Sequence, residues 1–153
     1  MNIWRWHKVT RIQQNPPLFR LLHRVDILDH ETLDVYLTRW EIIRTPWFGI
    51  NVHRIRRPDW ARHCHDHPWP FFAFIVKGGG YVQEVQRPQA NGVTVVELQR
   101  VELINNFPKG QYHKIIKILD GPAWSLVFRG RERSGWGFLV DSNHVPSAEY
   151  LAS

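Results

Sequence analysis

The sequence is poor in cysteine and has no long apolar run. Its 153 residues include a single cysteine, Cys64, so no disulfide can form within the chain, and we expect a reducing, cytoplasmic location. The longest uncharged apolar stretch, 69–76, is much shorter than the roughly 20 residues of a membrane-spanning helix. The first residues alternate aromatic and basic side chains and do not resemble a secretory signal, so we expect no membrane association.

Internal repeats, low-complexity segments and the motifs of nucleotide or ester hydrolysis are also absent. The glycines at 78–80 are not followed by the lysine and helix of a phosphate-binding loop, and no Gly-x-Ser-x-Gly elbow occurs. The formal net charge of +6 is modest and the basic residues form no long run, so we expect no nucleic-acid partner. A hydrophobic content of 43% in a chain of this length predicts one packed domain.

What the sequence does contain is a series of short strand patterns, rich in branched and aromatic residues. Turn signals separate them, among them Asn91-Gly92 and 108–110. Many short strands and almost no helix predict an all-β sandwich or barrel. The expected strands are 35–44, 48–52, 71–76, 81–86, 93–104, 111–119, 124–129 and 137–140.

The first 32 residues follow a different pattern and are expected to form an N-terminal arm, with the barrel over 33–153. The Asn-Pro-Pro at 15–17 predicts a capped helical piece over 18–24, and a last helical turn is expected over 146–151. Exposed barrel edges favour association with a second chain. We therefore expect a homodimer, with Trp4 and Trp6 at the contact.

Histidine and tryptophan are abundant, with nine and eight residues. His63, His65 and His67 alternate in one short segment, and in a strand they would project from the same face. Neutral imidazoles that converge are typical ligands of a transition metal. The alternative interpretation is a surface loop of histidines without a ligand role.

A distant histidine completes a pattern with this segment. His113 follows a turn at Pro108 and Gly110 that reverses the chain. The pair His65 and His67, a glycine at 78 or 79, and the Pro-x-Gly-x-x-His of 108–113 resemble the two motifs of the cupin superfamily. The resemblance covers about 35–140 and implies a jelly-roll (double-stranded β-helix) barrel. The segments 45–49 (TPWFG) and 65–69 (HDHPW) further resemble those of a group of cupin-like proteins from bacteria and phages.

The cupin resemblance implies a metal site formed by His65, His67 and His113. Fe(II) is the first choice, and Zn, Ni or Mn would also suit the ligands. The family's glutamate ligand would fall at Phe71 or Phe72, neither of which can bind a metal. Three histidines without a carboxylate resemble the ligand set of some cupin dioxygenases, including cysteine and diketone dioxygenases. The alternative explanation for the missing carboxylate is a metal site that has lost its function.

The pocket around this site is expected to be apolar with a few polar groups. His53 and Arg129 are candidates to anchor a substrate, and His63 is a reserve ligand or a neighbour of the ligands. No residue is assigned as catalytic. The expected aromatic lining residues are Trp69, Phe71, Tyr81, Trp124 and Phe128.

The leading prediction is a metal-dependent enzyme of dioxygenase type that acts on a small molecule in the barrel. Two other classes stay open. One is a non-catalytic cupin that binds a small ligand or a partner. The other is a metal-independent isomerase or epimerase with a histidine base and a tyrosine acid.

Overall fold

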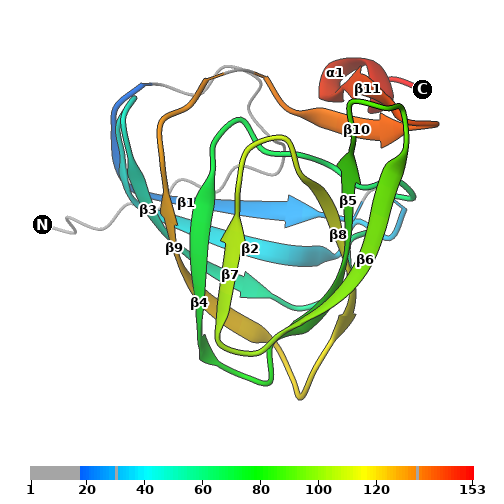
Figure 1. Cartoon of the computed structure of the whole chain (residues 1–153). Helices are drawn as coiled ribbons and strands as arrows, with labels where there is room; N and C mark the ends of the chain where they lie inside the picture. Colours follow the sequence, from blue (N-terminus) through cyan, green and yellow to red (C-terminus); the bar gives the residue numbers. More distant parts are fainter. Residues whose placement is uncertain (1–17, 30, 134) are drawn as a thin grey trace, which may run out of the picture.

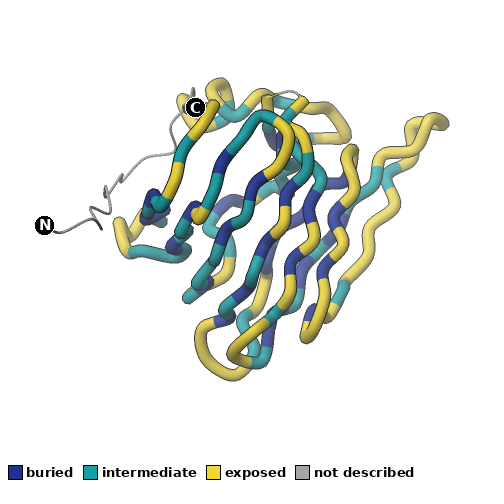
Figure 2. Tube along the Cα trace, turned by 90° about the vertical axis from the view of Figure 1, so that its left-hand side faces the viewer, coloured by how far each residue is buried: buried dark blue, intermediate teal, exposed yellow. Residues whose placement is uncertain are grey.

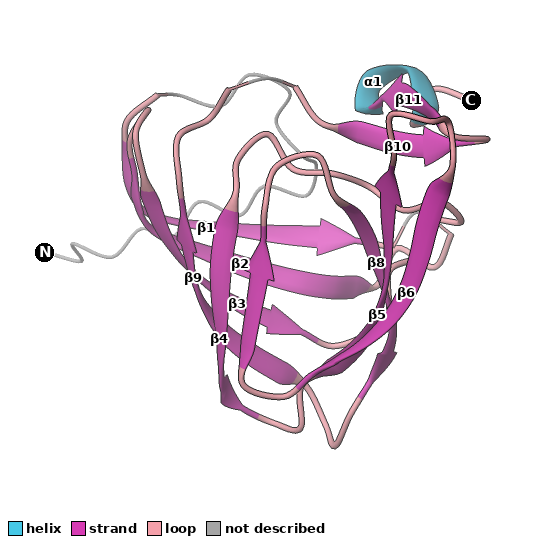
Figure 3. Ribbon diagram, in the orientation of Figure 1, coloured by secondary structure: helices cyan, strands magenta, loops and turns pink. Residues whose placement is uncertain are grey.

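A computed structural model describes residues 18–29, 31–133 and 135–153, most of which form antiparallel strands (Figure 1). One short helix, α1, lies close to the C-terminus (Figure 3). Within these described ranges, no helix is long and apolar enough to cross a bilayer. The elements are β1 (Arg20–Leu28), β2 (Val35–Arg44), β3 (Gly49–Ile55), β4 (Phe71–Lys77), β5 (Tyr81–Pro88), β6 (Thr94–Val101), β7 (Ile104–Phe107), β8 (Tyr112–Ile118), β9 (Ala123–Arg129), β10 (Gly137–Val140), β11 (Asn143–Pro146) and α1 (Ser147–Tyr150).

The strands form a large and a small sheet around a common interior, which confirms the predicted all-β class. The large sheet has six strands in the order β1-β2-β3-β9-β4-β7, and the small sheet has three in the order β6-β5-β8. A hairpin of β10 and β11 completes the structure. Strands that are neighbours in space are distant in sequence, as β9 between β3 and β4 shows, and this interleaving is typical of a jelly roll.

Alternation along the strands separates an inner from an outer face (Figure 2). On β4, Phe71 is 8% exposed and faces the interior, whereas its neighbour Phe72 is 51% exposed on the outer face. Phe71 stacks on Phe107 of β7, with ring centroids 4.8 Å apart. The inner face of the large sheet therefore carries a packed aromatic pair contributed by β4 and β7.

The predicted helical piece over 18–24 is wrong, because these residues belong largely to a strand. β1 pairs with β2 from Arg20 opposite Arg44 to Leu28 opposite Val35. Its buried residues include Val25 and Ile27, which alternate toward the interior, so strand pairing outweighs the capping signal before it. The expected arm thus contributes an edge strand to the sheet, while the capping residues at 15–17 and Trp4 and Trp6 lie outside the described residues.

The long strand predicted over 93–104 is two strands in different sheets. β6 ends at Val101 in the small sheet, and β7 begins at Ile104 in the large one. At this corner the backbone of Gly80 comes so close to the Val101 carbonyl that a side chain at position 80 would collide with it. Position 80 therefore requires glycine at this crossing between the two sheets. The other predicted strands are present, and α1 confirms the final helical turn.

Candidate metal centre

The segment 56–70, between β3 and β4, carries the histidine pair and is not a regular strand. Its residue His65 exchanges two backbone hydrogen bonds with His113 of β8, with N···O distances of 2.9 and 2.8 Å. On its other side, Cys64 and Asp66 bond to the backbone of β10 at Leu139 and Gly137. The pair is thus held between β8 and β10 rather than inside a sheet.

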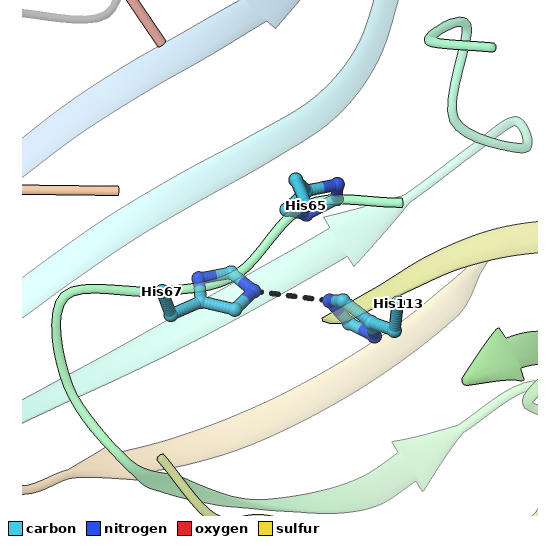
Figure 4. Close-up of side chains that lie close together, drawn as sticks. All are labelled: His65, His67 and His113. Carbon is cyan, nitrogen blue, oxygen red and sulfur yellow. Dashed lines mark hydrogen bonds between the residues drawn. The ribbon is translucent and has the colours of Figure 1, made fainter. Parts of the chain in front are cut away.

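His65, His67 and His113 come together as the cupin resemblance predicted. Each offers a ring nitrogen, and these three atoms lie within 4.8 Å of one another. The Nε2 atoms of His67 and His113 point toward each other and are joined by a hydrogen bond of 3.0 Å (Figure 4). Two ligands at right angles, each about 2.1 Å from one metal ion, would be about 3 Å apart, so this spacing fits a shared ion.

A buried amide sets the proton position on His113. The Oε1 atom of Gln83 lies 2.8 Å from His113 Nδ1, and a carbonyl oxygen can only accept, so the ring proton is on Nδ1. The Nε2 lone pair then points toward His67. Gln83 is fully buried and is itself held by Gln99 and by Asn105, which also donates to the Tyr81 hydroxyl. An outer partner of this kind is typical of metal-binding histidines.

Burial keeps two of the three imidazoles neutral. Loss of hydration lowers the pKa of His67 and of His113 well below the ordinary histidine value, and His65 adds to this effect on both. Both rings are therefore uncharged at neutral pH, the state in which imidazole binds a metal. A bound ion would replace the hydrogen bond between the two Nε2 atoms.

Aromatic rings enclose the histidines. Phe71 and Phe107 each meet the His67 ring edge-on, with centroids 5.1 and 5.2 Å away, and Trp136 and Phe138 lie beside His65. Phe71, and not Phe72, is thus the residue at the position where the family's glutamate was expected. The centre consists of three nitrogen donors in a largely apolar shell.

This geometry makes Phe71→Glu a direct test of the alignment. The new carboxylate would lie beside His67 and His113, so divalent metal should bind about tenfold or more tightly than in the wild type. The metal-free variant should unfold at a lower temperature, because a buried carboxylate without a partner is costly. Calorimetric metal titration and thermal unfolding measure the two effects. Phe72→Glu, one residue away on the outer face, is the matched control, and equal behaviour of both variants would contradict the assignment.

A cavity of about 1030 Å³ opens in front of the centre. This volume suits a small organic molecule. Four residues that the sequence predicted for the pocket line it, namely His53, Trp69, Phe71 and Tyr81, together with the three candidate ligands. Apolar groups such as Val25, Ile27 and Leu37 form much of the remaining wall.

The other four predicted pocket residues lie outside this cavity lining. His63 turns away, with Nδ1 3.0 Å from the Tyr150 hydroxyl, because its segment is not a strand. Trp124 stacks on Trp40 with centroids 5.5 Å apart, and Phe128 packs against Phe74 on the outer face. The inner face of β9 carries Ser125 and Val127 in their place.

Arg129, although buried, is also absent from the cavity lining. Its guanidinium lies 4.6 Å from the centroid of the Trp69 ring, and it donates to the Thr45 carbonyl at 3.3 Å. These contacts hold Arg129 at the end of the sheet. The structure therefore gives it a packing role instead of the predicted anchoring role.

Sequence reasoning missed several polar groups of the cavity. Tyr36, Arg39 and Asp59 line it, and Asp59 accepts a hydrogen bond from the Ile115 backbone at 2.7 Å. Burial raises the pKa of Asp59. In a strand, Leu37, Arg39 and Glu41 share one face, and this alternation is the signal that could have placed Arg39 in the cavity.

The single cysteine is buried and inert. Cys64 is 1% exposed, and burial, with a further contribution from Glu84, raises its pKa to about 12. A raised pKa favours the protonated thiol, so the reactive thiolate forms only as the pH approaches that value.

We expect alkylation of native Cys64 at pH 8 to be about a thousandfold slower than alkylation of the unfolded chain. Mass spectrometry with and without urea measures the two rates. Comparable rates in both states would show that the thiol is accessible.

Comparison with solved structures gives the class of fold, which is the cupin-type jelly roll that the motifs implied. The similar structures include oxalate decarboxylases. The formate complex of the Lactobacillus farciminis enzyme is 14% identical, with 92% of this chain and 39% of that chain covered and a TM-score of 0.51. Bacillus subtilis oxalate decarboxylase at pH 4.6 is 15% identical, with 86% and 31% covered and a TM-score of 0.50. This chain thus spans about a third of their length. No family model and no curated protein matches the sequence.

Proposed function

We propose that this protein binds a divalent transition metal through His65, His67 and His113 and acts as a metal-dependent oxygenase on a small molecule. The observation that carries the proposal is the convergence of three imidazole nitrogens at the wall of a cavity. Two of these imidazoles are kept neutral by burial, and the lone pair of His113 is aimed by Gln83. These are the conditions that a metal ligand set requires.

The chain's own residues have separate tasks in this proposal. Gln83 fixes the orientation of His113, and Phe71 and Phe107 exclude water from one side of the histidines. The cavity holds the small molecule next to them. A divalent ion held by three neutral imidazoles supplies Lewis-acid chemistry and, as Fe(II), redox chemistry toward dioxygen.

Fe(II) is our first choice of metal for a specific reason. The three ligands are neutral and leave further coordination positions open, which suits an anionic small molecule together with dioxygen. Zn, Ni and Mn also suit imidazole ligands, so the choice has to be measured.

Reconstitution is the test of the proposal. The chelated protein is loaded anaerobically with Fe(II), Mn(II), Ni(II) or Zn(II), desalted, and analysed for metal content. We expect about one ion per chain. Oxygen uptake is then measured over a panel of small organic acids. Oxalate, named in the neighbouring structures, is included with carbon dioxide release as a second readout.

The outcomes separate the classes of function. Metal retention with oxygen uptake supports the oxygenase. Retention with ligand binding but no turnover favours a non-catalytic binding protein. If none of the metals remains after desalting, the three histidines are not a working site, and a metal-independent isomerase or a binding protein becomes the leading alternative.

A further inference from the structure

An arginine that forms no salt bridge with any described residue faces the cavity from the large sheet. Arg39 lies on the inner face of β2, directly opposite His53 of β3 in the strand register, and both residues line the cavity. The Nε of Arg39 donates to His53 Nε2 at 3.2 Å. On its other side, Arg39 is opposite the apolar Val25 of β1.

The neighbouring arginines are paired, but Arg39 is not. Arg20 donates to Glu41 at 2.7 Å, and Arg44 donates to Glu132 at 2.7 Å. Within the described part of the chain, Arg39 forms no salt bridge, and its two terminal nitrogens donate to no residue. Glu41, two residues along the same face of β2, attracts Arg39 through space, but it is already bridged to Arg20 and Arg44. A guanidinium stays charged in a protein, so this part of the cavity wall keeps an excess of positive charge.

His53 fixes the position of the Arg39 side chain. Because its Nε2 accepts from Arg39, the proton of the neutral ring is on Nδ1. No described residue accepts from that atom. The nearby Asn51, two residues earlier on the same face of β3, lines the cavity, and its buried Oδ1 has no hydrogen-bond partner among the described residues. Because Oδ1 is an acceptor, it suits an N–H or O–H group of a ligand and not a carboxylate.

We propose that Arg39 binds the carboxylate of a small organic acid in the cavity that also contains the three histidines. The planar guanidinium presents paired N–H donors that match a carboxylate, and the contact with His53 leaves its two terminal nitrogens free to donate. One unpaired cation suits a singly charged anion, and the apolar wall beside it suits an organic remainder. This inference rests on the proposed function only in treating the acid as the substrate, because binding of the acid itself requires no metal.

The first test compares acids with their uncharged isosteres on the wild-type chain, both as purified and after chelation. Benzoate and propionate are titrated against the protein by ligand-observed NMR, with benzamide and propionamide as controls. We expect each acid to bind about tenfold or more tightly than its amide, as hydrogen bonds to a charged group predict. Equal affinities, or no binding of either acid, would overturn the inference.

The second test removes the guanidinium. Arg39→Gln should weaken acid binding about tenfold or more and leave amide binding unchanged, and Arg39→Lys should have a smaller effect, since it keeps the charge but loses the fork. Arg100→Gln, at a surface residue paired with Glu102, is the matched control and should bind like the wild type.

An unchanged acid affinity in Arg39→Gln would overturn the inference. If that variant does not fold, the comparison of acids and amides decides. If the protein retains no metal but still binds the acid, the proposed function is contradicted and this inference stands.

Discussion

Replacing His113 by alanine is expected to abolish metal retention. Loss of an outer partner alone typically costs about 10–100-fold in metal affinity, so loss of one of three ligands should raise the Kd by at least about 100-fold. His65→Ala and His67→Ala should have effects of similar size, because three ligands leave no redundancy. Calorimetric titration and metal analysis after desalting measure the change.

His63→Ala is the matched control for the ligand variants. His63 belongs to the same histidine-rich segment, but it contacts Tyr150 and does not line the cavity, so its metal content should equal that of the wild type. Loss of His113 also leaves Gln83 without one partner, and thermal unfolding of each variant separates this effect from the loss of a ligand. Normal metal content in a folded His113→Ala variant would refute the three-histidine site.

Phe107→Ala is expected to destabilise the fold by about 3–5 kcal/mol, which is typical of truncating a buried phenylalanine. Phe107 is 2% exposed and stacks on Phe71, and its ring also meets His67 and His113. The substitution removes these contacts and leaves a void beside the site. For a chain of this length, the unfolding midpoint should fall by about 10 °C.

The control for this variant is Phe72→Ala. Phe72 lies on the outer face of β4, where half of its surface is exposed, so truncation should change the free energy of unfolding by about 1 kcal/mol or less. Chemical denaturation of both variants gives the comparison. Similar losses for Phe107 and Phe72 would mean that the assignment of inner and outer faces is incorrect.

The motif residues could be predicted from the sequence because their signal is local. The spacing of His65 and His67, and the turn before His113, each lie within a few residues, and the fold brings the two segments together as the resemblance implied. The prediction of a helical piece over 18–24 failed because capping residues are also a local signal, whereas the pairing of β1 with β2 is a tertiary one.

The pocket walls were harder to predict because both faces of the large sheet carry apolar residues. On β9 the aromatic residues Trp124 and Phe128 lie outside, and the smaller Ser125 and Val127 line the cavity. A shift of one residue in a strand exchanges its two faces, so the side chains that face the cavity depend on the register. Composition alone favoured the large aromatic residues, which lie on the outer face. The pairing of Arg39 with His53 depends on the register of β2 against β3, which no short motif encodes.

The bridge at His65 links the candidate ligands to the end of the chain. His65 pairs through its backbone with His113 on one side and with Phe138 of β10 on the other. An ion that binds only the folded state adds about 2.7 kcal/mol to stability at a hundredfold excess over its Kd. Part of this linkage free energy would stabilise β10 through the backbone pairing of His65, so amide hydrogen exchange in the β10–β11 hairpin should slow when the metal binds.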